Sequence, residues 1–302
     1  MNKSSQLSLL MATLLPMLVS GHAYADLYDE KLEFAGTLEE TLGHFWALEM
    51  NLDENNAELA LVHATHPIAE LYDTMSSHLE DNPKFDAKLQ DTLMQLQHKA
   101  NTKVSREDAQ SAINEAKDII EEARMIVVGE SLSDDVAFKA QLINGLLETS
   151  KVEYMEAISD GIIEEMAEFQ DGSAFVWRSE QILDTLEGII DIETTNTARE
   201  NYEAVWNGYN QRADPSEISE LVDAIIEEIE TISGIESEES KHMEEVFGPK
   251  SPLQQIKSGT APSDVECKSG MELVLSNHDG KAACVSPSGV DKLESIGWGT
   301  RA

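Results

Sequence analysis

The chain has 302 residues, 41% hydrophobic and 26% charged, a composition typical of a folded globular protein and not of a disordered one. Acidic residues outnumber basic ones by 58 to 21, and the resulting net charge of −37 disfavours binding to nucleic acids and to anionic membrane surfaces. Aromatic residues make up only 6%, and Gly and Pro are few, which favours helices over a β-sandwich. The same charge attracts cations, although it can also serve only as a solubility device or an adaptation to salt.

The first 25 residues have the features of a secretory signal peptide. Lys3 supplies a positive start, 7–19 is a short apolar run, and Ala-Tyr-Ala at 23–25 is a small-x-small cleavage motif. The run is shorter than the roughly 20 residues that a transmembrane helix needs. We therefore expect an extracytoplasmic protein (secreted, at the cell surface or in a periplasm-like space) with no membrane span after cleavage. The alternative is an uncleaved anchor.

The segment 26–247 is expected to form an acidic helical bundle. Apolar residues recur at helical spacing from about Leu32 to Phe247, and strand-like alternation is absent. The clearest helix start is Asp214-Pro215-Ser216-Glu217, which combines an N-cap with a proline at the first helical position. The sequence therefore predicts an all-α fold, a multi-helix bundle of about eight helices.

Two of the expected helices carry most of the candidate chemistry. One extends from Leu59 to Leu79. The other begins at Ser133, carries apolar residues as far as Phe169 and ends at Gly172, with a kink near Gly145 or Gly161.

The composition changes after the bundle. The segment 248–262 is rich in Pro, Ser, Gly and Lys and is expected to be a linker. Short strands are predicted at 271–275 and 282–285 on either side of an Asp-Gly turn, followed by a short helix at 288–296.

The two cysteines fall within this last segment. Cys267 and Cys284 are expected to pair in an oxidising exterior. We therefore predict that 263–302 is a small disulfide-closed C-terminal β-hairpin module, stabilised by the disulfide because so few residues cannot bury a large core.

Histidines concentrate near the start of the expected bundle. His63 and His66 are three residues apart and Glu70 follows His66 by four, while Glu40 and His44 are four apart on the preceding helix. Such spacings place side chains on one helical face. If the two helices pack antiparallel, these residues form an imidazole–carboxylate cluster that suits iron, copper or zinc better than calcium. In the alternative interpretation, His66 only caps or kinks its helix before a proline, and His63 is exposed.

A second candidate is acidic. Glu153 and Glu156, then Glu165 and Glu168, form two Glu-x-x-Glu units twelve residues apart on the long expected helix, and Glu164 and Asp171 extend the second unit. Oxygen-rich groups of this kind bind hard cations, including ferric iron. In a chain this acidic, the alternative is a solvated helix face.

Motifs of known enzyme classes are missing from the sequence. We find no Gly-rich phosphate loop, nucleophile elbow, His-Glu-x-x-His or haem-attachment motif. A di-iron carboxylate centre needs a Glu-x-x-His on each of two helices, and only Glu239–His242 fits. We therefore expect that the protein is not an enzyme.

Two stretches resemble the helical extracytoplasmic region associated with high-affinity iron permeases. The first is Gly43–Leu79, with His-Ala-Thr-His-Pro-Ile-Ala-Glu-Leu-Tyr at 63–72. The second is Leu147–Leu183, with Glu153-Tyr154 and Glu168-Phe169-Gln170-Asp171. The permease's transmembrane helices and its Arg-Glu-Gly-x-Glu motif are missing. The resemblance therefore implies a freestanding metal-binding or delivery domain and not the channel.

The end of the chain is similar to a tail module of secreted proteins of ammonia-oxidising archaea. The similarity rests on Ser-Pro-Leu-Gln-Gln at 251–255, Cys-Lys-Ser-Gly-Met-Glu-Leu at 267–273, Ala-Cys-Val at 283–285 and Gly-Trp at 297–298. It implies an extracellular or cell-surface setting.

Together these observations predict an exported metal-ion-binding protein. It would be an accessory or delivery domain in iron or copper handling, with a metal ion (Fe, Cu or Zn) as cofactor and a membrane permease or another envelope protein as partner. The alternative is a non-catalytic structural or interaction protein of the cell envelope.

Overall fold

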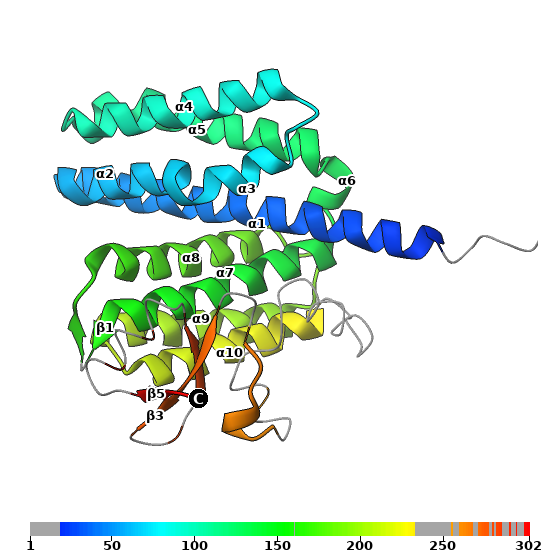
Figure 1. The fold of residues 1–302 in the computed structure, drawn as a ribbon, viewed down its shortest axis with the longest axis vertical. Coiled ribbons are helices and arrows are strands. Elements are labelled where there is room, and N and C mark those ends of the chain that lie inside the picture. The colour runs from blue at the N-terminus through cyan, green and yellow to red at the C-terminus, as the bar shows by residue number, and fades with distance from the viewer. Residues whose placement is uncertain are drawn as a thin grey trace, which may run out of the picture.

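The computed structural model describes residues 19–159, 161–232, 255, 260–267, 271–277, 280, 282–285, 290, 294 and 299–302, with the side chains of the first helix described from Leu27 onward. Helices dominate these residues, which confirms the predicted all-α bundle (Figure 1). The helices are α1 (Val19–Asp53), α2 (Ala57–His66), the π-helical turn η1 (Pro67–Leu71), α3 (Tyr72–Ser77), α4 (Pro83–Asn101), α5 (Arg106–Val127), α6 (Glu130–Ser133), α7 (Val136–Ala157), α8 (Met166–Asp184), α9 (Ile192–Gln211), α10 (Pro215–Ile232) and the short 3-10 helix η2 (Pro262–Asp264).

The long helices stack in layers. In Figure 1, α4 and α5 form one outer layer, α1 lies with α2 and α3 beneath it, α7 and α8 come next, and α9 and α10 form the opposite side. Their buried apolar residues form one continuous core that extends from Leu32 on α1 to Ile229 on α10. Within the described part of the chain, no helix is both long and apolar enough to cross a bilayer.

The prediction of a single long helix from Ser133 to Gly172 is wrong. Helix α7 ends at Ala157, and a two-stranded hairpin of β1 (Ile158–Ser159) and β2 (Ile162–Ile163) reverses the chain into α8. Gly161 has a φ of +72°, a conformation that glycine adopts without the strain of a Cβ atom. Because α7 and α8 are therefore antiparallel neighbours, residues near the end of α7 face residues near the start of α8.

The helix expected over Leu59–Leu79 is interrupted. Proline has no backbone N–H and its ring collides with the carbonyl four residues earlier, so Pro67 cannot continue an ordinary α-helix. The chain instead widens into the π-helical turn η1 before α3 resumes. His66 is the residue immediately before this turn. Turns of this kind are frequent at functional sites.

The C-terminal segment contains the predicted hairpin and one further strand. β3 (Glu272–Ser276) pairs antiparallel with β4 (Ala282–Val285) on one side and with β5 (Gly299–Arg301) on the other. The sequence did not predict β5. The expected linker at 248–262 and the expected helix at 288–296 fall almost entirely outside the described residues.

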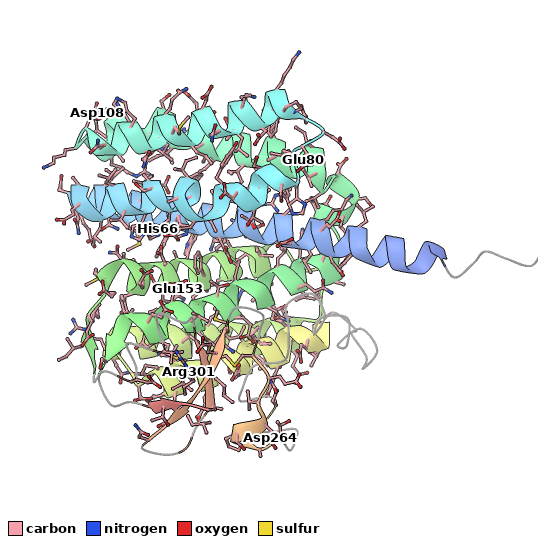
Figure 2. All side chains as sticks on the ribbon, in the orientation of Figure 1. His66, Glu80, Asp108, Glu153, Asp264 and Arg301 are labelled. Atoms are coloured by element: carbon pink, nitrogen blue, oxygen red, sulfur yellow. A yellow bond between two sulfur atoms is a disulfide. The ribbon has the colours of Figure 1, made fainter. Side chains whose placement is uncertain are left out.

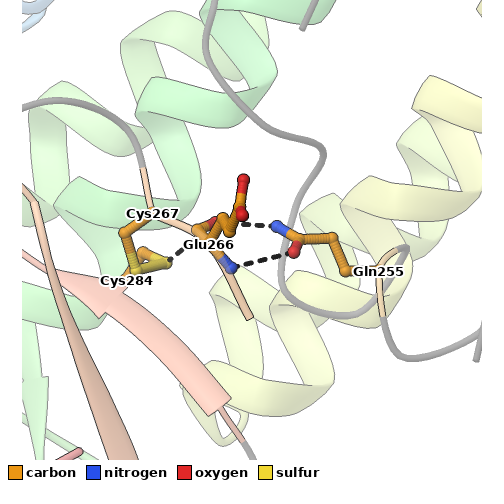
Figure 3. The surroundings of a disulfide bond; sticks show 4 residues. All are labelled: Gln255, Glu266, Cys267 and Cys284. Carbon is orange, nitrogen blue, oxygen red and sulfur yellow. Dashed lines mark hydrogen bonds between the residues drawn. A yellow bond between two sulfur atoms is a disulfide. The ribbon is translucent and has the colours of Figure 1, made fainter. Parts of the chain in front are cut away.

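The predicted disulfide is present. Cys267 and Cys284 are bonded, with their Cα atoms 5.5 Å apart. Figure 3 shows that the neighbouring Glu266 is held by Gln255, whose side chain accepts from the Glu266 amide at 2.9 Å and donates to the Glu266 carbonyl at 2.7 Å.

Candidate metal centre

Three histidines and one aspartate meet inside the bundle. His44 comes from α1, His63 and His66 from α2, and Asp171 from α8. Each offers one ligand atom, and these atoms all lie within 4.8 Å of one another. We call these four residues the His/Asp cluster. In Figure 2, His66 lies on the side of α2 that faces the layer of α7 and α8.

The cluster is built around the carboxylate of Asp171. Its Oδ1 atom lies 2.8 Å from Nδ1 of His44 and 3.0 Å from Nδ1 of His63, and its Oδ2 atom lies 3.0 Å from Nδ1 of His66. His44, His63 and Asp171 are buried, whereas the side chain of His66 keeps 13% exposure and forms the edge nearest solvent.

Two of the three Nδ1 atoms around Asp171 have no well-aligned hydrogen bond. The Nδ1 atoms of His44 and His66 are buried and lie 2.8 and 3.0 Å from Asp171 oxygens, yet neither contact has the alignment of a hydrogen bond. Buried polar atoms normally have a partner. A tetrahedral metal ion with bonds of about 2.1 Å separates its ligand atoms by about 3.4 Å. The crowding of these nitrogens and oxygens therefore fits one shared ion.

The surroundings favour an ionised carboxylate at the centre. Burial alone would raise the pKa of Asp171, but the charge of His44 and the close polar contacts of the three imidazoles hold it well below the usual value. Burial likewise disfavours a charged His66, but the neighbouring carboxylates, Asp171 foremost, outweigh it and raise the pKa of that imidazole. A buried anion ringed by imidazoles is also the donor set of a transition-metal site.

Gln170 and Asn51 support His63 from the side opposite Asp171. The Oε1 atom of Gln170 lies 2.7 Å from Nε2 of His63, and the Asn51 side-chain nitrogen donates to the same Oε1 atom at 2.8 Å. A metal-binding histidine commonly has its second ring nitrogen held in this way.

A pair of carboxyl groups borders the cluster. Glu153 on α7 and Glu168 on α8 lie close enough for each to affect the ionisation of the other. Burial, and then the charge of Asp171 and of the other acids nearby, raises the pKa of Glu153 to about 10. Two adjacent, partly buried carboxylates repel each other unless they share a proton or a cation. The antiparallel turn at Gly161 is what brings this pair together.

The other predicted ligands lie outside the His/Asp cluster. Glu40 accepts a hydrogen bond from Thr149 at 3.2 Å. Glu70 is largely exposed, with its carboxylate 3.8 Å from Nε2 of His66. Glu156 adds its charge to the surroundings of Glu153, and Glu165 is exposed at the N-cap of α8.

The structure also corrects two parts of the sequence interpretation. The alternative of an exposed His63 is wrong, because its side chain is fully buried. Asp171 was predicted only as an extension of the second Glu-x-x-Glu unit, three residues after Glu168, and not as a ligand beside the histidines. Because the sequence interpretation treated α7 and α8 as one helix, it did not place Asp171 near the histidines. No sequence pattern indicated that α2 contacts α8.

The fold and the cluster together define a helical-bundle protein with a largely buried three-histidine, one-aspartate cluster. Residues 129–236 match the family described as the iron permease-associated 4-helix bundle domain. No curated protein and no solved structure matches the chain.

The family match covers α7 to α10 and includes Asp171, whereas all three histidines of the cluster precede it. It overlaps Leu147–Leu183 and so confirms that part of the resemblance. The resemblance of Gly43–Leu79 and that of the archaeal tail module lie outside the match and stay predictions.

Proposed function

We propose that the protein binds a transition-metal ion at the His/Asp cluster. The observation that carries this proposal is the convergence of His44, His63, His66 and Asp171 on a space small enough for one ion. The Nδ1 atoms of His44 and His66 are buried there and lie within 3.0 Å of Asp171 oxygens without a well-aligned hydrogen bond, which a shared ion would account for. Imidazole nitrogens with one carboxylate suit Fe, Cu or Zn better than Ca or Mg.

We further propose that this binding serves iron handling outside the cytoplasm. The description of the matched domain supports a link to an iron permease. The signal-peptide features of 1–25 support export, and the disulfide is consistent with an oxidising compartment. In this proposal, the protein is a non-catalytic accessory or delivery domain, and a membrane permease or another envelope protein receives the metal.

The test is metal binding by the mature, disulfide-intact protein. Elemental analysis and calorimetric titration with Fe²⁺ under anaerobic conditions, Cu²⁺ and Zn²⁺ should give one tight site. The double variant His63→Ala/His66→Ala should lose it, and Asp171→Asn, which keeps the side-chain shape, should weaken it strongly. The matched control is His78→Ala/His98→Ala, because both of its histidines lie outside the cluster.

Two outcomes would contradict the proposal. One is binding by His63→Ala/His66→Ala as tight as that of the wild type. The other is only weak, salt-sensitive binding of many ions by the wild type, which would indicate that the acidic surface alone attracts cations. The protein would then belong to the structural or interaction proteins of the cell envelope.

A further inference from the structure

A chain of hydrogen bonds extends from the backbone of α1 to the ring of His63. It begins at the carbonyl oxygen of Ala47, which accepts from the side-chain nitrogen of Asn51 at 2.8 Å. A carbonyl can only accept, so this contact fixes which end of the Asn51 amide is the nitrogen. The proton positions along the rest of the chain follow from this one.

The Asn51 nitrogen has a second hydrogen, which it donates to Oε1 of Gln170 at 2.8 Å. This contact fixes the orientation of the Gln170 amide with its oxygen toward Asn51. The same oxygen lies 2.7 Å from Nε2 of His63. Because the oxygen only accepts, Nε2 of His63 must carry a proton.

The other nitrogen of His63 faces the opposite way. With its proton on Nε2, a neutral imidazole presents a lone pair at Nδ1. That lone pair points toward Asp171 Oδ1, 3.0 Å away. Two acceptors at this distance repel each other unless a proton or a metal ion lies between them or beside them. The imidazoles of His44 and His66 contact the same carboxylate through Nδ1.

We infer that Asn51 and Gln170 are positioning residues that hold His63 as an Nδ1 ligand, so that the cluster accepts a divalent transition-metal ion through imidazole nitrogen. This inference rests on the proposed function for the ion, but the direction of the hydrogen bonds stands without it. Since the direction starts at a backbone carbonyl, no rotation of a single side chain reverses it. Neither Asn51 nor Gln170 belongs to the four residues whose ligand atoms converge.

The first test reads the protons of His63 directly. Long-range ¹H–¹⁵N NMR of ¹⁵N-histidine-labelled full-length mature protein distinguishes Nδ1 from Nε2. With Zn²⁺ bound, we expect the His63 signals to show the metal on Nδ1 and a slowly exchanging proton on Nε2. In the metal-free protein, we expect the Nε2 proton to be retained. A Zn²⁺ ion on Nε2, or a ring protonated only at Nδ1, would overturn the inference.

The second test measures what the positioning contributes. Gln170→Leu removes the acceptor at similar volume and should lower the affinity for Co²⁺ about 10- to 100-fold, the range typical of the hydrogen-bond partners of metal ligands. Gln170→Glu keeps an acceptor for both neighbours and should restore affinity to within a few-fold of wild type. The visible absorption of bound Co²⁺ should shift in Gln170→Leu and return in Gln170→Glu.

Gln97→Leu is the matched control. Gln97 donates to Thr65 on α2 at 3.2 Å and lies outside the four residues of the His/Asp cluster. The same substitution there should leave Co²⁺ affinity and absorption unchanged, and thermal unfolding of each metal-free variant reports whether it folds. Co²⁺ affinity in Gln170→Leu equal to that in Gln97→Leu would overturn the inference. Failure of the wild type to bind any ion would instead refute the proposed function, and the metal-free NMR result would still decide the proton position.

Discussion

The Nδ1 atom of His63 lies 3.0 Å from Oδ1 of Asp171, although 108 residues separate them in the chain. One side chain comes from α2 and the other from α8, so the contact joins the hairpin of α1 and α2 to the hairpin of α7 and α8. Changes in how α7 packs on α8 are therefore expected to reach the cluster.

We expect Gly172→Ala to destabilise the protein by about 1–3 kcal/mol, because overpacking costs of this size are typical in closely packed interiors. A Cβ atom at Gly172 would lie 2.8 Å from the Tyr209 hydroxyl and 3.1 Å from the carbonyl oxygen of Ser150. The substitution should also weaken metal binding, because Gly172 directly follows Asp171. Chemical denaturation and metal titration measure the two effects.

Gly36→Ala is the control for that substitution. Gly36 lies within α1, and a Cβ atom there would meet nothing within 4 Å. Alanine should therefore stabilise the helix by up to about 1 kcal/mol. Equal effects of Gly172→Ala and Gly36→Ala on stability would show that the α7–α8 contact is not tight.

We expect Glu153→Gln to make the metal-free protein more stable than the wild type at high pH. Burial and nearby acids raise the pKa of Glu153 from an ordinary 4.5 to about 10. Between these two pH values, the folded state keeps a proton on Glu153 that the unfolded state releases. The contribution of this carboxyl group to the free energy of unfolding is therefore fully present below about pH 4.5 and is lost as pH rises toward 10. Glutamine does not titrate and keeps that stability.

Denaturant unfolding at about pH 4.5, 7 and 9 checks this expectation. The advantage of Glu153→Gln over the wild type should grow with pH. Glu165→Gln, at an exposed position on the N-cap of α8, should show no such growth. A constant difference across the three pH values would contradict the raised pKa.

We expect Glu39→Gln to cost about 3–5 kcal/mol at neutral pH, the range typical when one partner of a buried ion pair is removed. The carboxylate of Glu39 is buried and lies 2.9 Å from Arg124 and 2.5 Å from Arg178. Burial alone would raise the pKa of Glu39, but the two guanidinium groups outweigh it and lower the pKa. The stability from this carboxylate is therefore present above about pH 4.5 and is lost as pH falls through the lowered pKa.

The difference in unfolding free energy between wild type and Glu39→Gln should accordingly shrink in acid. Glu122→Gln removes one partner of an exposed pair with Lys88, and its cost should stay below about 1 kcal/mol. A Glu39→Gln effect no larger than that of Glu122→Gln would show that the buried network does not stabilise the fold.

Reduction of the Cys267–Cys284 bond should loosen the C-terminal module. In the chain-entropy description, a bond between residues 17 apart stabilises by about 3 kcal/mol. We expect Cys267→Ser/Cys284→Ser to increase protease cleavage within 263–302, while the far-ultraviolet circular dichroism of the helices changes little. Equal cleavage rates in the variant and the wild type would contradict a stabilising role.

Local sequence signals located most of the helices. Asp214 caps α10 as expected, accepting from the Ser216 amide at 2.9 Å, and Ser105 accepts from the Asp108 amide at the start of α5. Helical spacing also brought His63 and His66 to one face. Each of these features depends on residues only a few positions apart, which is why the sequence alone revealed them.

The rest of the site depends on contacts between distant helices. The apolar spacing continues across the turn at Gly161, so periodicity did not separate α7 from α8. Without that turn, Asp171 could not be placed opposite the histidines, and Glu153 could not be placed against Glu168. Gln170 gave no local signal at all, because its role follows from Asn51 and His63 on two other helices.

The four cluster residues come from two different parts of the chain, so a bound metal ion would stabilise the packing of one part on the other. The region that matches the permease-associated domain supplies the carboxylate, and the helices before it supply every imidazole. An ion bound there would link the helices before residue 129 to the matched region 129–236. At a free metal concentration 100 times the dissociation constant, the bound ion would raise the free energy of unfolding by about 2.7 kcal/mol. Removing the ion would remove the same amount, so a partner that separates α2 from α8 would also lower the affinity for the metal.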